Sequence, residues 1–523
     1  MPFPRLAGII LHPTSLPGGD GVGDLGEAAR SFVDFLADSG MGIWQVLPLG
    51  PPGGSNSPYQ SLSSHAGNPI LISMGNLVDL GLLEPEDLKG APVNTTAALF
   101  EPAARFKERA LRKALENFSD ACAEPSLTME YNAFCQAEKE WLDDFALFAA
   151  AKSCFGGQPW YKWKDAELRH HEPKSVKKHA KLLSGEIRFQ KFQQFLFFRQ
   201  WRELRAYAAG KHVKLLGDIP IYCAHDSADV WAESRFFQLD SKGGAALMAG
   251  VPPDYFSATG QLWGNPLYNW KAMREDGYRW WRRRIRATLA QVDMLRIDHF
   301  RGFQAYWAVS KGETTAVNGR WLKGPGQELF EAFRKELGDN LPIVAEDLGI
   351  ITPAVDKLRL DNNLPGMKVL HFAFSDGAES YLPHTYEPNT VCYVATHDND
   401  TTRGWYEAVG DDYAHMSREA IGHERDRARR YLGRDGSDMT WDLMRLALSS
   451  VADTAILLMQ DVLNLPNSCR MNRPGLGENQ WLWRLTTEQL AEAPRGWLKD
   501  MAHLYGRQPI KSERKAAQDV ETE

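Results

Sequence analysis

Eight short apolar runs recur along the chain, and stretches with helical spacing lie between them. The runs are rich in β-branched and long aliphatic residues and are bounded by turn residues, a pattern typical of buried parallel strands. They cover residues 6–11, 43–49, 213–219, 294–297, 343–345, 367–372, 391–395 and 455–459. Strands that alternate with helices in this way predict an α/β fold, a closed (β/α)₈ TIM barrel with its chemistry at the carboxyl ends of the strands.

A doubly wound open sheet is the alternative architecture for such an alternation. That fold would place a glycine-rich phosphate loop directly after the first strand. The glycine-rich segment 18–21 comes later than that and lacks the required spacing, which favours the barrel.

The spacing of the runs also predicts insertions in the barrel. Residues 75–210, between the second and third runs, have helical character with aromatic stripes and predict a mainly helical subdomain. A second insertion is expected at 223–292, and its glycine- and proline-rich part, 250–266, is expected to form a loop. The barrel would then span 1–505, and the charged, weakly patterned residues 506–523 would form a disordered tail.

Acidic residues follow several of the predicted strands. Asp298 and Glu346 come directly after the fourth and fifth runs, and Asp398 follows the seventh. Asp218 lies at the end of the third run, one residue before its last, and Asp461 follows the eighth. A carboxylate at the end of a buried strand is in a costly place unless a site uses it, so we expect an active site at this end of the barrel.

The neighbours of two of these acids suggest what each does. Arg296 lies two residues before Asp298 and therefore points to the same face of the strand, where it would keep this carboxylate ionised. An ordinary ion pair that anchors the strand end is the alternative. Glu346 and Asp347 must face opposite ways, and burial or a second charge would let Glu346 carry a proton near neutral pH. In the alternative reading, Asp347 caps a helix and Glu346 is merely solvated.

Other motifs and the composition narrow the class of function. The pair His397 and Asp398 could ligate a metal, but no HExxH partner accompanies it, and no cofactor is expected. No nucleophile elbow or Walker loop is present, so two carboxylates with an arginine and histidines favour cleavage of a glycosidic bond.

Charge, hydropathy and cysteine spacing bear on partners and location. A net charge of −7 argues against a nucleic-acid partner. No apolar run is long enough to span a membrane, and no signal peptide is apparent. The six cysteines lack CxxC spacing, which favours a reduced, cytoplasmic location.

Taken together, several motifs resemble those of the 4-α-glucanotransferases called amylomaltase or disproportionating enzyme, glycoside hydrolase family 77 of the α-amylase clan. The resemblance runs from about Arg5 to Leu485. The motifs read Ser57-Pro58-Tyr59-Gln60, Gly217-Asp218-Ile219-Pro220, Asp226-Ser227-Ala228-Asp229-Val230-Trp231, Arg296-Ile297-Asp298-His299-Phe300-Arg301-Gly302, Ala345-Glu346-Asp347-Leu348-Gly349, Thr396-His397-Asp398-Asn399-Asp400-Thr401 and Arg470-Met471-Asn472-Arg473-Pro474-Gly475. Their number and order make the resemblance specific.

The resemblance implies a retaining transfer of α-1,4-glucan segments between maltooligosaccharides or other α-1,4-glucans. It assigns the nucleophile to Asp298, oriented by Arg296, and the general acid/base to Glu346. It assigns the transition-state stabiliser to Asp398, with His397 beside it. A glucan hydrolase of the same clan and a non-catalytic glucan-binding protein are the alternatives.

The resemblance also implies residues that bind the substrate. Those expected to touch the sugar directly are Asp218, His299 and the aromatic Tyr59. Within the loop 250–266, the aromatic residues are Tyr255, Phe256 and Trp263. Three positions depart from the pattern of the family, namely His371 in place of a glutamine, Leu476 in place of a threonine and Gln480 in place of an asparagine.

Overall fold

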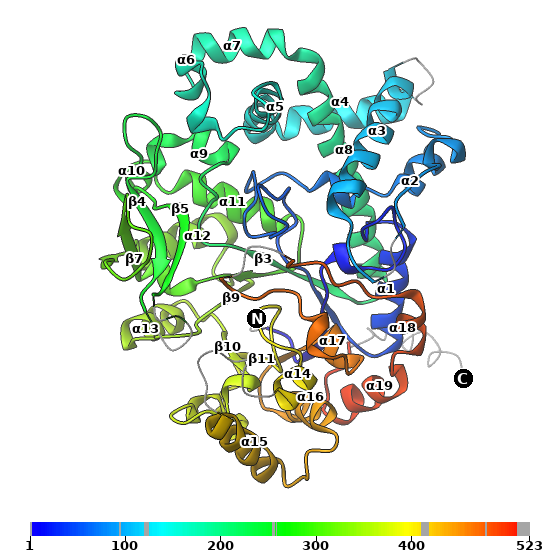
Figure 1. The fold of residues 1–523 in the computed structure, drawn as a ribbon, viewed down its shortest axis with the longest axis vertical. Coiled ribbons are helices and arrows are strands. Elements are labelled where there is room, and N and C mark those ends of the chain that lie inside the picture. Colours follow the sequence, from blue (N-terminus) through cyan, green and yellow to red (C-terminus); the bar gives the residue numbers. More distant parts are fainter. Residues whose placement is uncertain are drawn as a thin grey trace, which may run out of the picture.

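The computed structural model describes residues 3–93, 96–119, 125–253, 257, 259–408, 418–475 and 479–509. Eight parallel strands form its centre, with helices around them (Figure 1). These strands are β1 Leu6–Ile10, β2 Ile43–Gln45, β3 Lys214–Ile219, β6 Met294–Ile297, β9 Ile343–Ala345, β10 Gly366–Val369, β11 Thr390–Tyr393 and β12 Thr454–Leu458. Each of the eight predicted runs contains one of these strands or most of it, so the predicted strand pattern is confirmed.

The strands close into a barrel. Their order is β10-β11-β12-β1-β2-β3-β6-β9, and every neighbouring pair is parallel. The two end strands meet where the Ala345 amide donates a hydrogen bond to the Pro365 carbonyl at 2.9 Å. The predicted (β/α)₈ barrel is therefore confirmed, and the carboxyl ends of all eight strands lie at one end of it.

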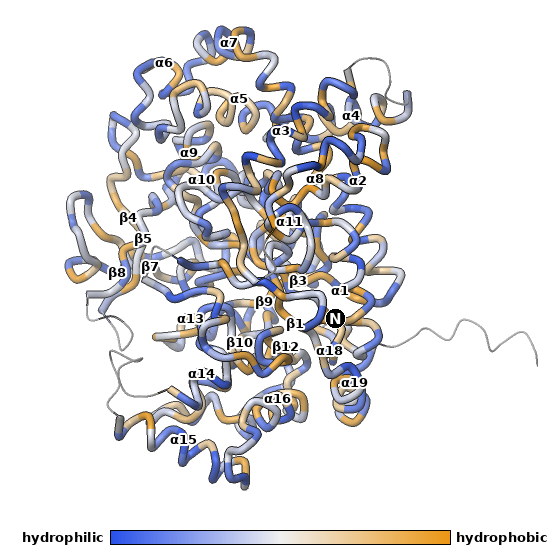
Figure 2. Tube along the Cα trace, turned by 45° about the vertical axis from the view of Figure 1, so that its right-hand side comes forward, coloured by the Kyte–Doolittle hydropathy of each residue, from blue (hydrophilic) through white to orange (hydrophobic). Residues whose placement is uncertain are grey.

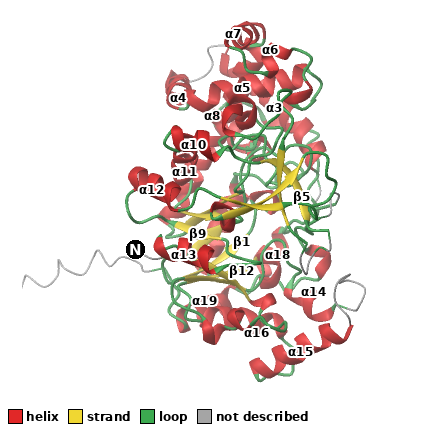
Figure 3. Ribbon diagram, turned by 90° about the vertical axis from the view of Figure 1, so that its left-hand side faces the viewer, coloured by secondary structure: helices red, strands yellow, loops and turns green. Residues whose placement is uncertain are grey.

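Amphipathic helices cover the outside of the barrel (Figure 3). Those that precede or follow its strands are α1 Glu27–Asp38, α8 Ser184–Gly210, α11 Arg279–Leu289, α12 Gln327–Leu337, α13 Pro353–Asp361, α16 Met439–Ser449 and α19 Arg495–Leu504. Hydrophobic residues recur at intervals along these helices (Figure 2), as one buried face requires. α1 buries Phe32, Val33 and Leu36 and ends at Asp38, and Gly40 follows with a φ of 69°, which suits a glycine just after a helix end.

The segment between β2 and β3 is mainly helical and lies at the top of Figure 1. It contains α2 Met74–Asp79, α3 Phe100–Ser119, α4 Pro125–Ala137, α5 Lys139–Cys154, α6 Ala166–Arg169 and α7 Pro173–Leu182, and it ends with α8. On α8 the aromatic stripe Phe189, Phe192 and Phe195 is buried. Phe192 packs on Phe118 of α3 with ring centroids 5.1 Å apart, so the stripe forms the core between these helices.

A second, antiparallel sheet lies beside the barrel, at the left of Figure 1. Its order is β5 Gln261–Pro266, β4 Leu247–Val251, β7 Ala305–Ser310 and β8 Arg320–Lys323. The prediction that 250–266 is a loop was wrong at both of its ends, because β4 and β5 pair there as a hairpin. These strands are short and half exposed, so their sequence carries little periodic apolar signal.

The remaining helices connect these elements. They are α9 Ala228–Ala232, α10 Trp270–Glu275, α14 Thr402–Glu407, α15 Arg418–Leu432, α17 Met459–Val462 and α18 Thr487–Glu492. In the described part of the chain, no helix is both long and apolar enough to cross a membrane.

The predicted start of the tail at residue 506 was also wrong. Arg507 is fully buried, and its guanidinium donates hydrogen bonds to the carbonyls of Leu448, Ser450 and Ala452. These bonds join the segment after α19 to the end of α16 and to the segment before β12, so the packed chain continues beyond 506. Residues 510–523 of the predicted tail lie outside the described residues.

Candidate active site

Three neighbouring barrel strands bring three of the five predicted acids together. β3, β6 and β9 are adjacent in the sheet, and Asp218 on β3 lies directly opposite Arg296 on β6. Asp298 follows β6, and Glu346 follows β9. Because parallel strands end at the same edge of a barrel, these side chains share one site.

Arg296 joins two of the acids. Its Nη1 donates to Asp218 Oδ2 at 2.6 Å, and its Nη2 donates to Asp298 Oδ1 at 2.9 Å. Burial alone would lower the pKa of Arg296, but the two carboxylates hold its pKa well above the usual value. Arg296 therefore stays charged and fixes the direction of the Asp298 carboxylate, whose side chain is 32% exposed at the site.

Asp218 forms the buried wall of this group. Its Oδ2 also accepts the Tyr59 hydroxyl at 2.7 Å, and its side chain is fully covered. Burial raises the pKa of Asp218 to about 7, because the favourable charge of Arg296 does not offset burial together with the like charge of Asp298. The carboxyl of Asp218 can therefore hold a proton near neutral pH, whereas Asp298 has the more open position.

Glu346 is held by two backbone amides. The His299 N–H donates to Oε2 at 2.6 Å, and the Leu348 N–H donates to Oε1 at 2.9 Å. The backbone of His299 is left-handed, with φ of 54°, which is unusual for a residue with a side chain. This turn directly after Asp298 directs the His299 amide at Glu346 and so ties the ends of β6 and β9 together.

The environment of Glu346 favours its protonated form near neutral pH. Burial, followed by the charge of Asp298, raises the pKa of Glu346 to about 7. Asp347 points elsewhere, because its Oδ1 accepts the Met367 amide at 2.7 Å and its Oδ2 lies 3.1 Å from Arg359 Nε. Of these two consecutive acids, only Glu346 lies at the site.

Asp398 is held by a different part of the chain. Its Oδ1 accepts a hydrogen bond of 2.6 Å from Asn472 Nδ2 and lies 3.4 Å from His397 Nε2. Arg470 donates to the Asp398 carbonyl and to the Asp400 carboxylate. The segment after α17 thus positions the loop that follows β11.

Three aromatic rings pack beside this loop. Tyr59 stacks on His397 with ring centroids 5.2 Å apart, and Trp481 lies 5.6 Å from His397 and 6.1 Å from Tyr59. Trp481 is buried, and its φ of 68° is unusual for so large a residue. Asn472 and Trp481 both lie at or near a motif, yet sequence reasoning gave them no role, since what they contact comes from distant parts of the chain.

Asp461 does not join the group around Arg296. Its carboxylate accepts the Thr402 amide at 2.7 Å and the Thr402 hydroxyl at 2.9 Å, and it is buried. His371 Nε2 lies 3.0 Å from the same hydroxyl. Because the hydroxyl proton goes to Asp461, His371 donates from Nε2, and the three side chains fix the start of α14.

The predicted loop residues are only partly described. Trp263, on β5, packs edge-on against His299 with ring centroids 4.9 Å apart, so it lies next to the group that holds Glu346. Burial lowers the pKa of His299 to about 3, and this imidazole is therefore neutral. Tyr255, Phe256 and Leu476 lie outside the described residues. Among the residues that are described, no three His, Cys, Asp or Glu side chains are placed to hold a metal ion.

The fold and this site define a class of protein, a (β/α)₈-barrel enzyme with ionisable groups at its strand ends. A family model described as 4-alpha-glucanotransferase matches residues 11–490. The chain therefore belongs to this family, glycoside hydrolase family 77, and is an enzyme of the 4-α-glucanotransferase class.

Individual relatives agree with this assignment over their full lengths. The chain is 48% identical to a 4-alpha-glucanotransferase of Synechocystis, covering 96% of this chain and 98% of the relative. It is 45% identical to that of Thermus thermophilus, covering 96% and 99%. Among solved structures, the amylomaltase from Streptococcus agalactiae in complex with acarbose has a TM-score of 0.90 at 36% identity, covering 96% of this chain and all of that one.

Proposed function

We propose that this enzyme transfers α-1,4-glucan segments between maltooligosaccharides through a covalent glycosyl-enzyme on Asp298. One observation carries the proposal. The Asp298 carboxylate, which accepts a hydrogen bond from the charged Arg296, lies beside Glu346, a buried carboxyl group with a pKa raised to about 7. A nucleophile and a proton donor side by side are what a retaining glycosidic reaction needs.

In the first half of the reaction, the Asp298 carboxylate attacks the anomeric carbon of the donor. Glu346 gives its proton to the glycosidic oxygen, so that the bond to the leaving sugar breaks as the ester forms. The loss of its proton leaves Glu346 ionised, with the amides of His299 and Leu348 to stabilise the charge.

In the second half, Glu346 takes a proton from the 4-hydroxyl of an acceptor sugar, and this oxygen displaces Asp298. Asp398 holds hydroxyls of the distorted donor sugar in both halves, with Asn472 and His397 fixing the direction of its carboxylate. Its exposed side chain, 43% accessible, is free to make these contacts.

The other predicted residues surround the sugar in this scheme. Tyr59 supplies a ring for stacking, and Asp218 and His397 form the wall beside it. Trp263 and His299 lie on the acid/base side, and the 250–266 segment, whose sequence includes Tyr255 and Phe256, is proposed to cover the bound sugar. A cover that excludes water favours transfer to a sugar over hydrolysis.

Product analysis with maltotriose tests the proposal. Transfer yields glucose together with oligomers longer than maltotriose, whereas a hydrolase of the same clan yields shortened products alone. The variants Asp298→Asn and Glu346→Gln should abolish both outcomes while leaving the fold intact by circular dichroism. Full activity in either variant would rule out the assigned roles, and binding of glucans without any turnover would favour a glucan-binding protein.

A further inference from the structure

A cavity of about 70 Å³ lies behind the candidate active site. The ends of β2 and β3, the segment 59–66 and helix α11 form its walls. Tyr59 and Asp218 of the site line it on one side, and Ser63, His65 and Arg284 also line it. The volume has room for about five water molecules, and both polar and apolar side chains line it.

Three of the lining side chains carry a buried polar atom that lacks a partner. Within the described part of the chain, His65 Nε2, Asp218 Oδ1 and Arg284 Nε make no hydrogen bond. All three residues are more than nine-tenths buried, with exposures of 5%, 4% and 2%. A buried polar atom without a hydrogen-bond partner is costly, so three of them around one cavity indicate a polar occupant.

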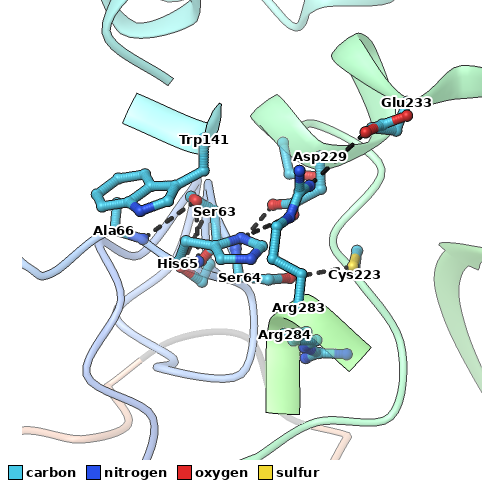
Figure 4. Close-up of polar contacts among 12 residues, drawn as sticks. Ser63, Ser64, His65, Ala66, Trp141, Cys223, Asp229, Glu233, Arg283 and Arg284 are labelled. Carbon is cyan, nitrogen blue, oxygen red and sulfur yellow. Dashed lines mark hydrogen bonds and ion pairs between the residues drawn. The ribbon is translucent and has the colours of Figure 1, made fainter. Parts of the chain in front are cut away.

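His65 is held so that only one ring nitrogen is available (Figure 4). Its Nδ1 lies 3.4 Å from Asp229 Oδ1, and its ring packs on Trp141 of α5 with centroids 6.0 Å apart. Asp229 also accepts the Ser64 amide at 2.7 Å. Although burial alone would raise it, the pKa of Asp229 is lowered by His65 and this amide, so an ionised carboxylate faces the imidazole.

We propose that the cavity binds a short chain of ordered water molecules that links Asp218 to His65, and that a proton passes along this chain in each half of the reaction. The inference rests on the proposed function, because it needs the charge of Asp298 to change during turnover.

The reason for the proton transfer is the shared arginine. Asp218 and Asp298 both bind Arg296, and each charge makes the other harder to form. When Asp298 becomes an ester, Asp218 is the carboxyl group that remains hydrogen-bonded to Arg296. Glu346 gains a charge in the same step, but the like charge that acts on Asp218 is that of Asp298, and its loss favours ionisation of Asp218. Its O–H bond then breaks, the water chain passes the proton on, and an N–H bond forms at His65 Nε2, giving an imidazolium beside Asp229.

Release of the sugar reverses this step. Asp298 regains its charge, the proton returns from His65 to Asp218, and no other reactant is consumed. Other charged or titratable groups also face the two ends of the chain, namely Tyr59 and Tyr393 at Asp218, and Arg284, Cys223 and Tyr268 near Asp229. A glucan bound at the front of the site would separate Asp218 from solvent, so the cavity offers a route from behind.

A crystal structure of the full chain, with and without xenon, tests the water chain. We expect ordered waters within hydrogen-bonding distance of Asp218 Oδ1 and His65 Nε2, and no xenon in the cavity. Xenon there, or an absence of ordered water, would overturn the proposal, because dry apolar cavities bind xenon and wet polar ones do not.

Variants of His65 test the proton transfer. His65→Phe keeps a ring against Trp141 but removes both nitrogens, and we expect it to lower kcat by roughly tenfold with little change in KM. In His65→Ala, added imidazole should restore kcat, whereas pyrrole, which fills the same space without a basic nitrogen, should not. The matched control is His171→Phe, because His171 also pairs with an aspartate, Asp144 at 3.0 Å, and packs on a tryptophan, Trp231, away from the cavity.

Each outcome decides the role of His65. Wild-type kcat in His65→Phe, a loss that imidazole does not restore, or equal rescue by imidazole and pyrrole would overturn the proton transfer. These results would leave the proposed function intact if Asp298→Asn and Glu346→Gln are inactive. Activity in those two variants would instead remove the proposed function itself.

Discussion

The ends of β6 and β9 and the ends of β11 and β12 both carry acids, yet the two regions use them differently. Around β6 and β9, Asp298 and Glu346 meet a charged arginine and two backbone amides, and both remain directed at the site. After β12, each carboxylate oxygen of Asp461 accepts a hydrogen bond from Thr402. A strand-end acid is therefore a candidate for catalysis when its partners hold it at the site beside a second carboxylate, whereas an acid that fixes the start of a helix, as Asp461 does, serves the fold.

The sharpest test of this contrast compares Asp298→Asn with Asp461→Asn. We expect Asp298→Asn to lower kcat by at least about 10³-fold with little change in Tm, because the amide cannot act as the nucleophile. Asp461→Asn should lower Tm and retain most of kcat. Transfer assays on maltotriose and thermal unfolding measure the two effects, and a reversed pattern would contradict the division between the two regions.

Removal of the guanidinium of Arg296, which Asp218 and Asp298 share, should cause the next largest loss of activity. Arg296→Met leaves Asp218 and Asp298 side by side without a counter-charge in a buried place. We expect a loss of about 10²-fold in kcat/KM and a destabilisation of about 3–5 kcal/mol in urea unfolding. Arg286, which binds Glu336 at the surface, provides the control, and Arg286→Met should change neither quantity much.

The raised pKa of Glu346 predicts how activity depends on pH. Glu346 must carry a proton in the first half of the reaction, and its pKa is about 7. Above that pH the protonated fraction falls about tenfold per unit, so kcat/KM should fall with it. A pH profile between 5 and 9, in Glu346→Asp as well as the unaltered enzyme, tests this, and an activity that stays level to about pH 9 would contradict the assignment.

The loop that carries Asp398 depends on a contact from a distant segment. Asn472→Ala removes the hydrogen bond of 2.6 Å to Asp398 Oδ1. We expect kcat/KM to fall by about tenfold, as the loss of one hydrogen bond to a charged group allows, with Tm nearly unchanged. Asn318→Ala, which removes an exposed bond to Glu313, is the control for an amide deletion, and equal activity in both variants would show that Asn472 does not position Asp398.

The smallest effect on activity is expected at the ends of β11 and β12, where Asp461 binds Thr402. Thr402→Val keeps the shape of the side chain but removes the hydroxyl between His371 and Asp461. We expect a destabilisation of about 1–3 kcal/mol and a kcat within a few-fold of the unaltered enzyme. Urea unfolding and the transfer assay check this, and a large loss of kcat without loss of stability would place Thr402 in the chemistry instead.

The sequence predicted those parts of the fold that neighbouring residues determine, and it missed those that depend on contacts between distant residues. The barrel strands are buried on both faces, so each is a continuous apolar run that the sequence displays directly. The second sheet was missed because β8 is mostly exposed and β5 half exposed, which leaves no run of that kind. The start of the tail was misplaced because a charged residue, Arg507, is buried by hydrogen bonds to backbone carbonyls that no local pattern records.

The sequence by itself determined the eight strands, the positions of the acids at their ends and, through the motifs, the family. Apart from Arg296 beside Asp298, which their spacing in the sequence predicted, only the tertiary structure decided which partners each acid has. Asn472 reaches Asp398 across 74 residues, and His65 reaches Asp229 across the whole helical insertion. Such contacts exist only once the barrel closes and brings its loops to one end, so the strand pattern is local information while the electrostatics of the site is a property of the fold.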